Sequence, residues 1–185
     1  NSGAFGLFLP NNFELTVRDN VLYNNARAAM QLSGFETYER TGRADNLPQN
    51  HRITDNVLFA AGEGQACLLF RLPFDYGFMG GNYLCAPYSE APLLARGVGK
   101  RRYEKSRLTI AEWQEQFPWA DRAPRTDLTR PDEDEAPSDF SRLVVNDAPD
   151  RRDMPLGEGI YHDPDGRILT GRVSLGPYSS TVLVR

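Results

Sequence analysis

One seven-residue pattern recurs three times in this chain, at residues 17–23, 53–59 and 79–85. Each copy is a short apolar segment, a turn that carries one asparagine, and a second apolar segment. The asparagines are Asn20, Asn56 and Asn82. Internal repeats of this kind are typical of stacked coils, in which each repeat packs only on its neighbours. The pattern therefore predicts a scaffold, and function is expected in surface residues outside the repeat.

The alternation of apolar residues predicts which side chains face inward. Because successive side chains of a strand point to opposite faces, Val17, Ile53 and Met79 are expected to stack in the interior. The three asparagines would then lie above one another at the bend, where stacked amides stabilise β architectures.

A second apolar segment also recurs along the chain. It is found at residues 6–9, 29–32, 66–69 and 92–95. Leu9 and Leu32 are 23 positions apart (32 − 9), a spacing within the range of stacked repeats. The same alignment places Leu7, Met30 and Cys67 inward, and it makes the polar stretch 35–50 a loop inserted into one coil.

Composition excludes several classes of protein. With 185 residues, of which 40% are hydrophobic and 25% charged, the chain can form a packed core. Its net charge of −4 argues against a general nucleic-acid partner. No apolar run approaches the roughly 20 residues that span a bilayer, so no membrane partner is expected. Two cysteines, Cys67 and Cys85, make no disulfide framework and are expected as small buried residues.

The first residues have neither an initiating methionine nor a basic leader segment. We therefore expect a piece of a longer or processed protein. Its first coil would expose an apolar end and unpaired strand edges. The partner expected there is an N-terminal segment or a second chain that stacks on residues 1–25.

Three sections are predicted along the chain. Residues 1–98 would form the coils, residues 99–139 a basic segment, a short helix and an acidic Pro-rich connector, and residues 140–185 a small β cap. In the middle section, Thr109 and Glu112 have the spacing of a capping box at the start of a helix. In the last section, residues 163–166 (Asp-Pro-Asp-Gly) predict a turn between two strands.

With these features the chain resembles the pectate-lyase-like superfamily. The resemblance is carried by the Gly-Leu-Phe-Leu segment at 6–9, the Asp-Asn-Val-Leu segments, and the tail at residues 161–166 and 173–183. It implies an all-β fold, the last coils of a right-handed parallel β-helix with a short helix and a small antiparallel C-terminal cap. It also implies a secreted, extracellular or periplasmic protein, similar to polysaccharide lyases or glycoside hydrolases, that acts on or binds an acidic polysaccharide or oligosaccharide. The catalytic centre would then lie largely upstream of this segment.

Few residues offer catalytic chemistry. The outward positions Phe8, Gln31 and Leu68 include no acid or base. His51 and Arg52 are the catalytic candidates, since histidine is the natural base near neutral pH. The alternative is a polar pair at the edge of a strand.

Two groups of residues are candidates for binding an acidic sugar, because aromatic faces meet sugar rings and arginine pairs with carboxylates. The first group could line a groove, and its alternative is a structured turn. The second is a cationic strip, and its alternative is a basic loop that pairs with the acidic residues 132–135. The groups are Tyr38, Arg40, Arg71, Asp75 and Tyr76, and then Lys100, Arg101 and Arg102.

No cofactor motif is evident. Clustered aspartates make Ca²⁺ the one ion to consider, although no ligand set stands out. A function of another class stays open beside the carbohydrate hypothesis. It is a non-catalytic structural or assembly module that caps the stack and pairs with an N-terminal chain.

Overall fold

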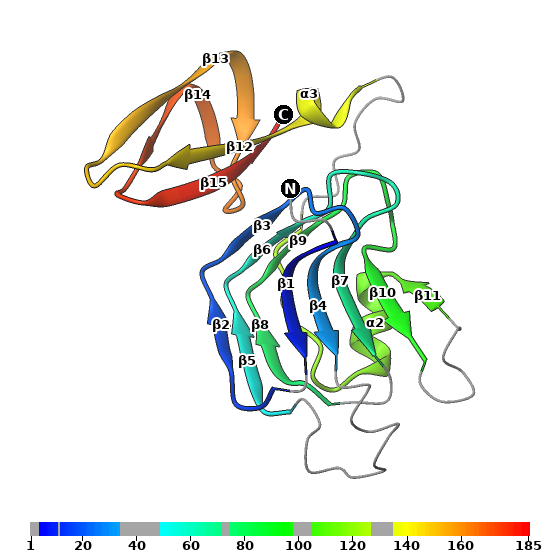
Figure 1. The fold of residues 1–185 in the computed structure, drawn as a ribbon. Coiled ribbons are helices and arrows are strands. Elements are labelled where there is room, and N and C mark those ends of the chain that lie inside the picture. Colours follow the sequence, from blue (N-terminus) through cyan, green and yellow to red (C-terminus); the bar gives the residue numbers. More distant parts are fainter. Residues whose placement is uncertain (1–3, 11, 34–48, 72–74, 98–104, 127–134) are drawn as a thin grey trace. The chain divides into compact units, whose positions relative to one another are not determined.

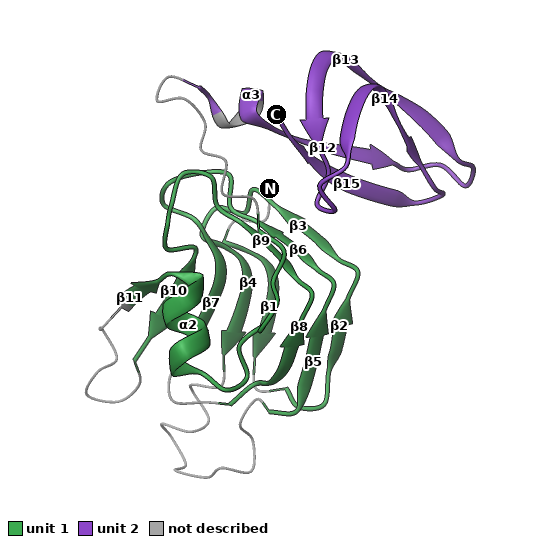
Figure 2. Cartoon of the chain, turned by 180° about the vertical axis from the view of Figure 1, so that it is seen from behind, with its two compact units in different colours: residues 1–128 green, residues 129–185 purple. Residues whose placement is uncertain are grey.

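The computed structural model describes residues 4–10, 12–33, 49–71, 75–97, 105–126 and 135–185. The chain divides into two compact units, residues 1–128 and 129–185 (Figures 1 and 2). The helix of the predicted middle section belongs to the first unit.

The first unit is built from three sheets in which successive passes of the chain lie side by side (Figure 1). The largest has the order β1-β4-β7-β10-β11 and contains β1 (Phe5–Pro10), β4 (Ala28–Ser33), β7 (Ala66–Arg71), β10 (Leu93–Arg96) and β11 (Lys105–Leu108). The second contains β2 (Thr16–Arg18), β5 (His51–Thr54) and β8 (Gly77–Gly80), and the third β3 (Val21–Tyr23), β6 (Val57–Phe59) and β9 (Tyr83–Cys85). All pairs are parallel except β10–β11, which is antiparallel.

The predicted fold class, a single right-handed parallel β-helix with a terminal cap, is wrong. The described strands form four separate sheets with parallel and antiparallel pairs, and none of these sheets is closed. The physical reason lies at the turns. Asp19, Asp55 and Gly81 have φ of 58°, 56° and 66°, so the backbone turns sharply there and the strands on either side belong to different sheets. The repeat correctly predicts these local turns, but a local pattern does not specify how sheets join.

The register confirms part of the predicted stacking. Val17 pairs with Ile53 and Ile53 with Met79, and Leu9 pairs with Leu32. The expected stacking of Met30 on Cys67 and the expected outward position of Leu68 are wrong, because Met30 pairs with Leu68. Leu68 therefore faces inward with Met30, and the residue beside Gln31 is Leu69. Cys67 is fully buried in the same core, as expected.

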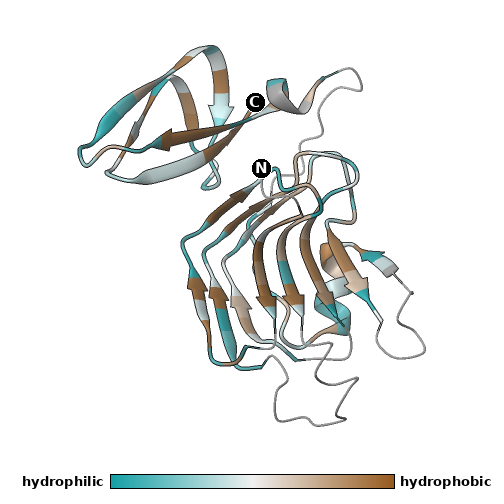
Figure 3. Cartoon of the chain, in the orientation of Figure 1, coloured by the Kyte–Doolittle hydropathy of each residue, from teal (hydrophilic) through white to brown (hydrophobic). Residues whose placement is uncertain are grey.

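The core of the first unit lies between the sheets. Met30, Ile53, Leu58 and Leu68 have no exposed surface, and Figure 3 shows hydrophobic residues along β4 and β7. Helix α2 (Ile110–Gln116) adds Trp113, which is fully buried.

The predicted helix start is confirmed by its capping box. The Thr109 side chain accepts from the main-chain N–H of Glu112, and the Glu112 carboxylate accepts from the N–H of Thr109. The Glu112 carboxylate accepts from the Thr109 N–H and also from the Thr109 hydroxyl, and these two bonds hold the pKa of Glu112 below its ordinary value.

The second unit is an antiparallel sheet of order β12-β15-β13-β14 that follows the short helix α3 (Pro137–Phe140). Its strands are β12 (Ser141–Asn146), β13 (Arg152–His162), β14 (Ile168–Leu175) and β15 (Ser179–Val184). The predicted turn is confirmed, since Gly166 N donates to Asp163 O at 2.9 Å. Val144, Leu156, Val173, Leu175 and Leu183 form its core.

Candidate functional site

The three repeat asparagines form one hydrogen-bonded row across the first unit. Asn20 donates from its main-chain nitrogen and from Nδ2 to Asn56 Oδ1, at 3.2 and 3.0 Å. Asn56 donates in the same way to Asn82 Oδ1, at 3.1 and 3.0 Å. The row therefore has a direction: each asparagine donates toward the next one in sequence and accepts from the previous one.

Each inner asparagine also joins its pass of the chain to the previous pass. Asn56 Nδ2 donates to Val17 O at 3.0 Å, and Asn82 Nδ2 donates to Ile53 O at 3.0 Å. Both acceptors are three positions before the previous asparagine. Asn56 and Asn82 are fully buried, so these bonds satisfy amides that would otherwise be costly to bury.

Asp121 closes the row at one end. Its Oδ2 accepts from the main-chain nitrogen of Asn82 at 2.9 Å and from Nδ2 at 3.0 Å, and it is fully buried. A carboxylate accepts hydrogen bonds and has none to donate, so the row ends here. The neighbouring Arg125 extends the closure, because its main chain pairs with Asn82 O and with the N–H of Leu84.

Sequence analysis missed Asp121. Successive members of the row are 36, 26 and 39 positions apart in the sequence, so no constant period predicts the position of Asp121. The available signal was composition, since an acidic residue directly follows Trp119 and Ala120, both of which are buried.

The other end of the row is open. Within the described residues, β1, β2 and β3 each pair on one side alone, with β4, β5 and β6. Asn20 is exposed, and its Oδ1 accepts no hydrogen bond from the residues that the structure describes. Asn20 Nδ2 donates to Arg18 O and Asn56 Oδ1. Among the described residues it makes no bond to a main-chain carbonyl of a previous pass, which both inner asparagines make.

Apolar side chains are uncovered at the same edge. Leu7, Val17 and Leu22 are partly exposed. Their register partners in the next pass, Met30, Ile53 and Leu58, are fully buried. We call β1, β2 and β3 together the open edge.

The catalytic candidates His51 and Arg52 point in opposite directions. His51 is buried, its Nδ1 accepts from Leu15 N at 3.3 Å, and burial lowers its pKa below 6.5. Arg52 is exposed, and its guanidinium lies 5.1 Å from the centre of the Phe78 ring. The structure therefore does not bring this pair together as a catalytic unit.

Two of the binding candidates take part in local structure. Tyr76 is buried, and its hydroxyl accepts from Arg71 N at 3.0 Å and lies 3.3 Å from Leu32 O. Burial raises the pKa of the Tyr76 hydroxyl. Asp75 Oδ1 accepts from Gly77 N at 2.9 Å, which closes a tight turn. The candidates Tyr38, Arg40, Lys100, Arg101 and Arg102 lie outside the described residues.

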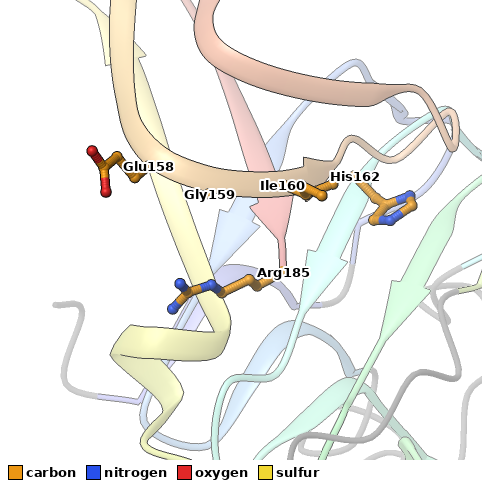
Figure 4. Close-up of a pocket in the computed structure, with 5 residues that line it drawn as sticks. All are labelled: Glu158, Gly159, Ile160, His162 and Arg185. Carbon is orange, nitrogen blue, oxygen red and sulfur yellow. The ribbon is translucent and has the colours of Figure 1, made fainter.

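The second unit contains an open depression of about 600 Å³, lined by Glu158, Gly159, Ile160, His162 and Arg185 (Figure 4). In Figure 4 the His162 ring extends away from Glu158 and Arg185. The charged groups therefore do not converge on one point.

The described residues contain no group of three or more His, Cys, Asp or Glu side chains placed to hold a metal ion. Neither α2 nor α3, the helices of the described ranges, has the length and apolar character of a membrane-spanning helix. No family model, no curated protein and no solved structure matches this chain.

Proposed function

We propose that the first unit is a non-catalytic assembly module that takes up strands of a partner polypeptide at its open edge. The observation that carries this proposal is the asymmetry of the asparagine row. One end is closed by Asp121, whereas Asn20 at the other end has an acceptor oxygen without a donor in the described chain.

Strand addition fits the chemistry of the open edge. Unpaired strands present main-chain N–H and C=O groups to which an extended peptide can bind, and side chains at alternate positions then give specificity. Each main-chain hydrogen bond contributes about 1 kcal/mol net. Burial of the partly exposed Leu7, Val17 and Leu22 would add to that stabilisation.

The test uses a peptide that copies one pass of this chain. Residues 49–60 contain β5, the Asp55-Asn56 turn and β6. A fluorescein-labelled peptide of that sequence, titrated with the full chain, should show a saturable rise in fluorescence anisotropy. A scrambled peptide of the same composition is the control.

A matched pair of variants locates the binding. Thr16 pairs with Arg52, but Arg52 N donates to Leu15 O. In a parallel ladder the N–H of Thr16 therefore faces the open side. Thr16→Pro removes that donor, whereas Thr16→Val keeps it, so Thr16→Pro should weaken peptide binding about tenfold relative to Thr16→Val. Absence of saturable binding, or equal binding by both variants, contradicts the proposal.

A second candidate function is the binding of an acidic saccharide, and one specific observation favours it. Phe78 is 52% exposed, and the Arg52 guanidinium lies 5.1 Å from its ring. An exposed aromatic ring beside a guanidinium offers a face for a sugar ring and a partner for a uronate carboxylate.

This candidate is tested by titration with uronate oligomers. NMR shift changes should gather at Arg52 and Phe78, and Arg52→Gln should weaken binding while Arg142→Gln, in the second unit, leaves it unchanged. Unchanged spectra at millimolar oligomer would remove this candidate.

A further inference from the structure

We infer that the polypeptide recognised at the open edge is a strand–turn–strand segment whose turn carries Gly-Asn, and that it is not a second copy of this chain. This inference rests on the proposed function and specifies the partner. It follows from the direction of the asparagine row and from the residue that precedes each asparagine.

The direction of the row defines what the partner must supply at Asn20. Inside the row, each Oδ1 accepts one main-chain N–H and one side-chain amide from the previous pass. Asn20 Oδ1 faces the position where such a pass would lie. A turn asparagine provides both donors from one residue, whereas an aspartate provides only its main-chain N–H.

The partner must also supply an acceptor for Asn20 Nδ2. The inner asparagines donate to the carbonyl three positions before the previous asparagine, Val17 O for Asn56 and Ile53 O for Asn82. A strand that leads directly into the partner's turn places a carbonyl at that position. The requirement therefore favours a strand followed by the turn over an isolated asparagine on a loop.

The residue before the partner's asparagine is selected by backbone conformation and charge. At this position Asp19, Asp55 and Gly81 all have positive φ, which glycine adopts most easily. The partner's residue would stand beside Asp19, which already has Asp55 beside it in the next pass. A carboxylate at the partner's position would add a third to this row, and like charges at neighbouring positions are destabilising. Glycine avoids that charge and adopts positive φ without strain, as Gly81 does at the same position of the third pass.

A second copy of the chain does not meet these requirements. Two open edges face to face would set Asn20 Oδ1 against Asn20 Oδ1, two acceptors without a donor. The opposite end of the row is occupied, because Asp121 and Arg125 already bond to Asn82. Self-association through the row is therefore disfavoured in both arrangements.

Three labelled peptides test the inference against the full chain. The first has the sequence of residues 49–60, the second carries Asp55→Gly, and the third carries Asn56→Asp. We expect the Asp55→Gly peptide to bind several-fold more tightly than the first, and the Asn56→Asp peptide to bind about tenfold more weakly, because a carboxylate would face the Asn20 oxygen.

A protein variant assigns the discrimination to Asn20. In the Asn20→Ala variant, with folding checked by circular dichroism, the dissociation constants of the Asn56 and Asn56→Asp peptides should differ by about twofold or less. If Asn20→Ala does not fold, the ranking of the three peptides on the unaltered chain still decides the inference.

The outcomes separate the inference from the proposed function. If all three peptides bind equally and Thr16→Pro weakens each of them, the assembly function stands and the Gly-Asn preference is wrong. If none of them binds, the assembly function itself fails. Dimerisation of the chain alone in sedimentation, weakened by Thr16→Pro, overturns the exclusion of a second copy.

Discussion

Asp121 Oδ2 receives two hydrogen bonds from Asn82, one from the main-chain nitrogen at 2.9 Å and one from the side-chain amide at 3.0 Å. The two residues belong to segments 39 positions apart, and both are fully buried. This contact makes the asparagine row directional. The row ends on a carboxylate that only accepts hydrogen bonds, and it begins at Asn20, whose Oδ1 accepts no hydrogen bond from the described residues.

Removal of the carboxylate should strongly destabilise the first unit. Asp121→Ala removes the acceptor of the buried Asn82 main-chain N–H and one of the acceptors of Asn82 Nδ2, which costs about 2–4 kcal/mol. The midpoint of urea unfolding should fall accordingly. Asp147→Ala is the control, since the Asp147 side chain is 89% exposed and its replacement should leave the midpoint unchanged. Equal midpoints for the two variants would show that Asp121 does not support the row.

The position of an asparagine in the row should determine how much its loss destabilises the protein. Asn56 bonds to both neighbouring passes, whereas Asn20 is exposed and, among the described residues, bonds to one pass alone. Asn56→Ala is expected to lower the free energy of unfolding by about 3 kcal/mol, and Asn20→Ala by about 1 kcal/mol or less. Thermal and urea unfolding measure both. If Asn20→Ala loses more free energy of unfolding than Asn56→Ala, the row is not open at Asn20.

His51 should make stability fall in mildly acidic solution. Burial lowers its folded-state pKa below the ordinary 6.5, so the unfolded state binds the proton more readily. The contribution of His51 is therefore complete above about pH 6.5 and decreases as the pH falls from there toward the folded-state pKa.

Comparison with a histidine variant isolates this effect. His51→Gln keeps an acceptor for Leu15 N and removes the titrating ring. The loss of stability between about pH 7.5 and about pH 5 should be smaller in His51→Gln than in the unaltered chain. An identical pH dependence in the two proteins counts against a buried, neutral His51.

The two cysteines should be unreactive in the folded protein. Cys67 and Cys85 are buried and form no disulfide, and burial raises the pKa of the Cys67 thiol, so little Cys67 thiolate is present at neutral pH. A thiol reagent such as dithionitrobenzoate should label neither cysteine until the protein is unfolded in urea. Ser174→Cys adds a thiol at an exposed position, which should react at once. Rapid labelling of the unaltered chain would contradict the packing around Cys67.

The Tyr76 hydroxyl should contribute measurably to stability. Tyr76→Phe removes its bonds to the main chain of Arg71 and Leu32, with an expected cost of about 1–2 kcal/mol. Tyr178 is 73% exposed, so Tyr178→Phe serves as the control and should be neutral. Urea unfolding of the two variants gives the comparison. Similar stability for both would show that the buried hydroxyl is not needed.

Local features of this protein could be predicted from the sequence because they depend on near neighbours. The Asn56 turn has the same flanking residue types as the Asn20 turn, and the Thr109–Glu112 capping box depends on one turn of helix. The register of β7 was harder to predict from the sequence. A shift of one residue exchanges the two faces of a strand. The polar stretch 35–50 interrupts the constant spacing in sequence that would have distinguished Cys67 from Leu68.

Other features depend on contacts that no local pattern records. Asp121 reaches Asn82 from beyond helix α2, and β11 reverses direction against β10 within a segment that was predicted as a basic run. The predicted fold class failed for the same reason, since repeated turns do not state whether their strands join into one sheet. His51 and Arg52 are adjacent in sequence but lie on opposite faces of β5, so adjacency was a poor guide to a shared site.

Residue-resolved amide exchange at the open edge tests the central claim most directly. The N–H groups of Thr16 and Arg18 alternate with that of Val17, so they face the side of β2 on which no described strand pairs. Addition of the residue 49–60 peptide carrying Asp55→Gly should slow their exchange by about tenfold or more and leave the second unit unchanged. If the peptide saturates the chain while the exchange of Thr16 and Arg18 stays the same, the open edge is not where a partner binds.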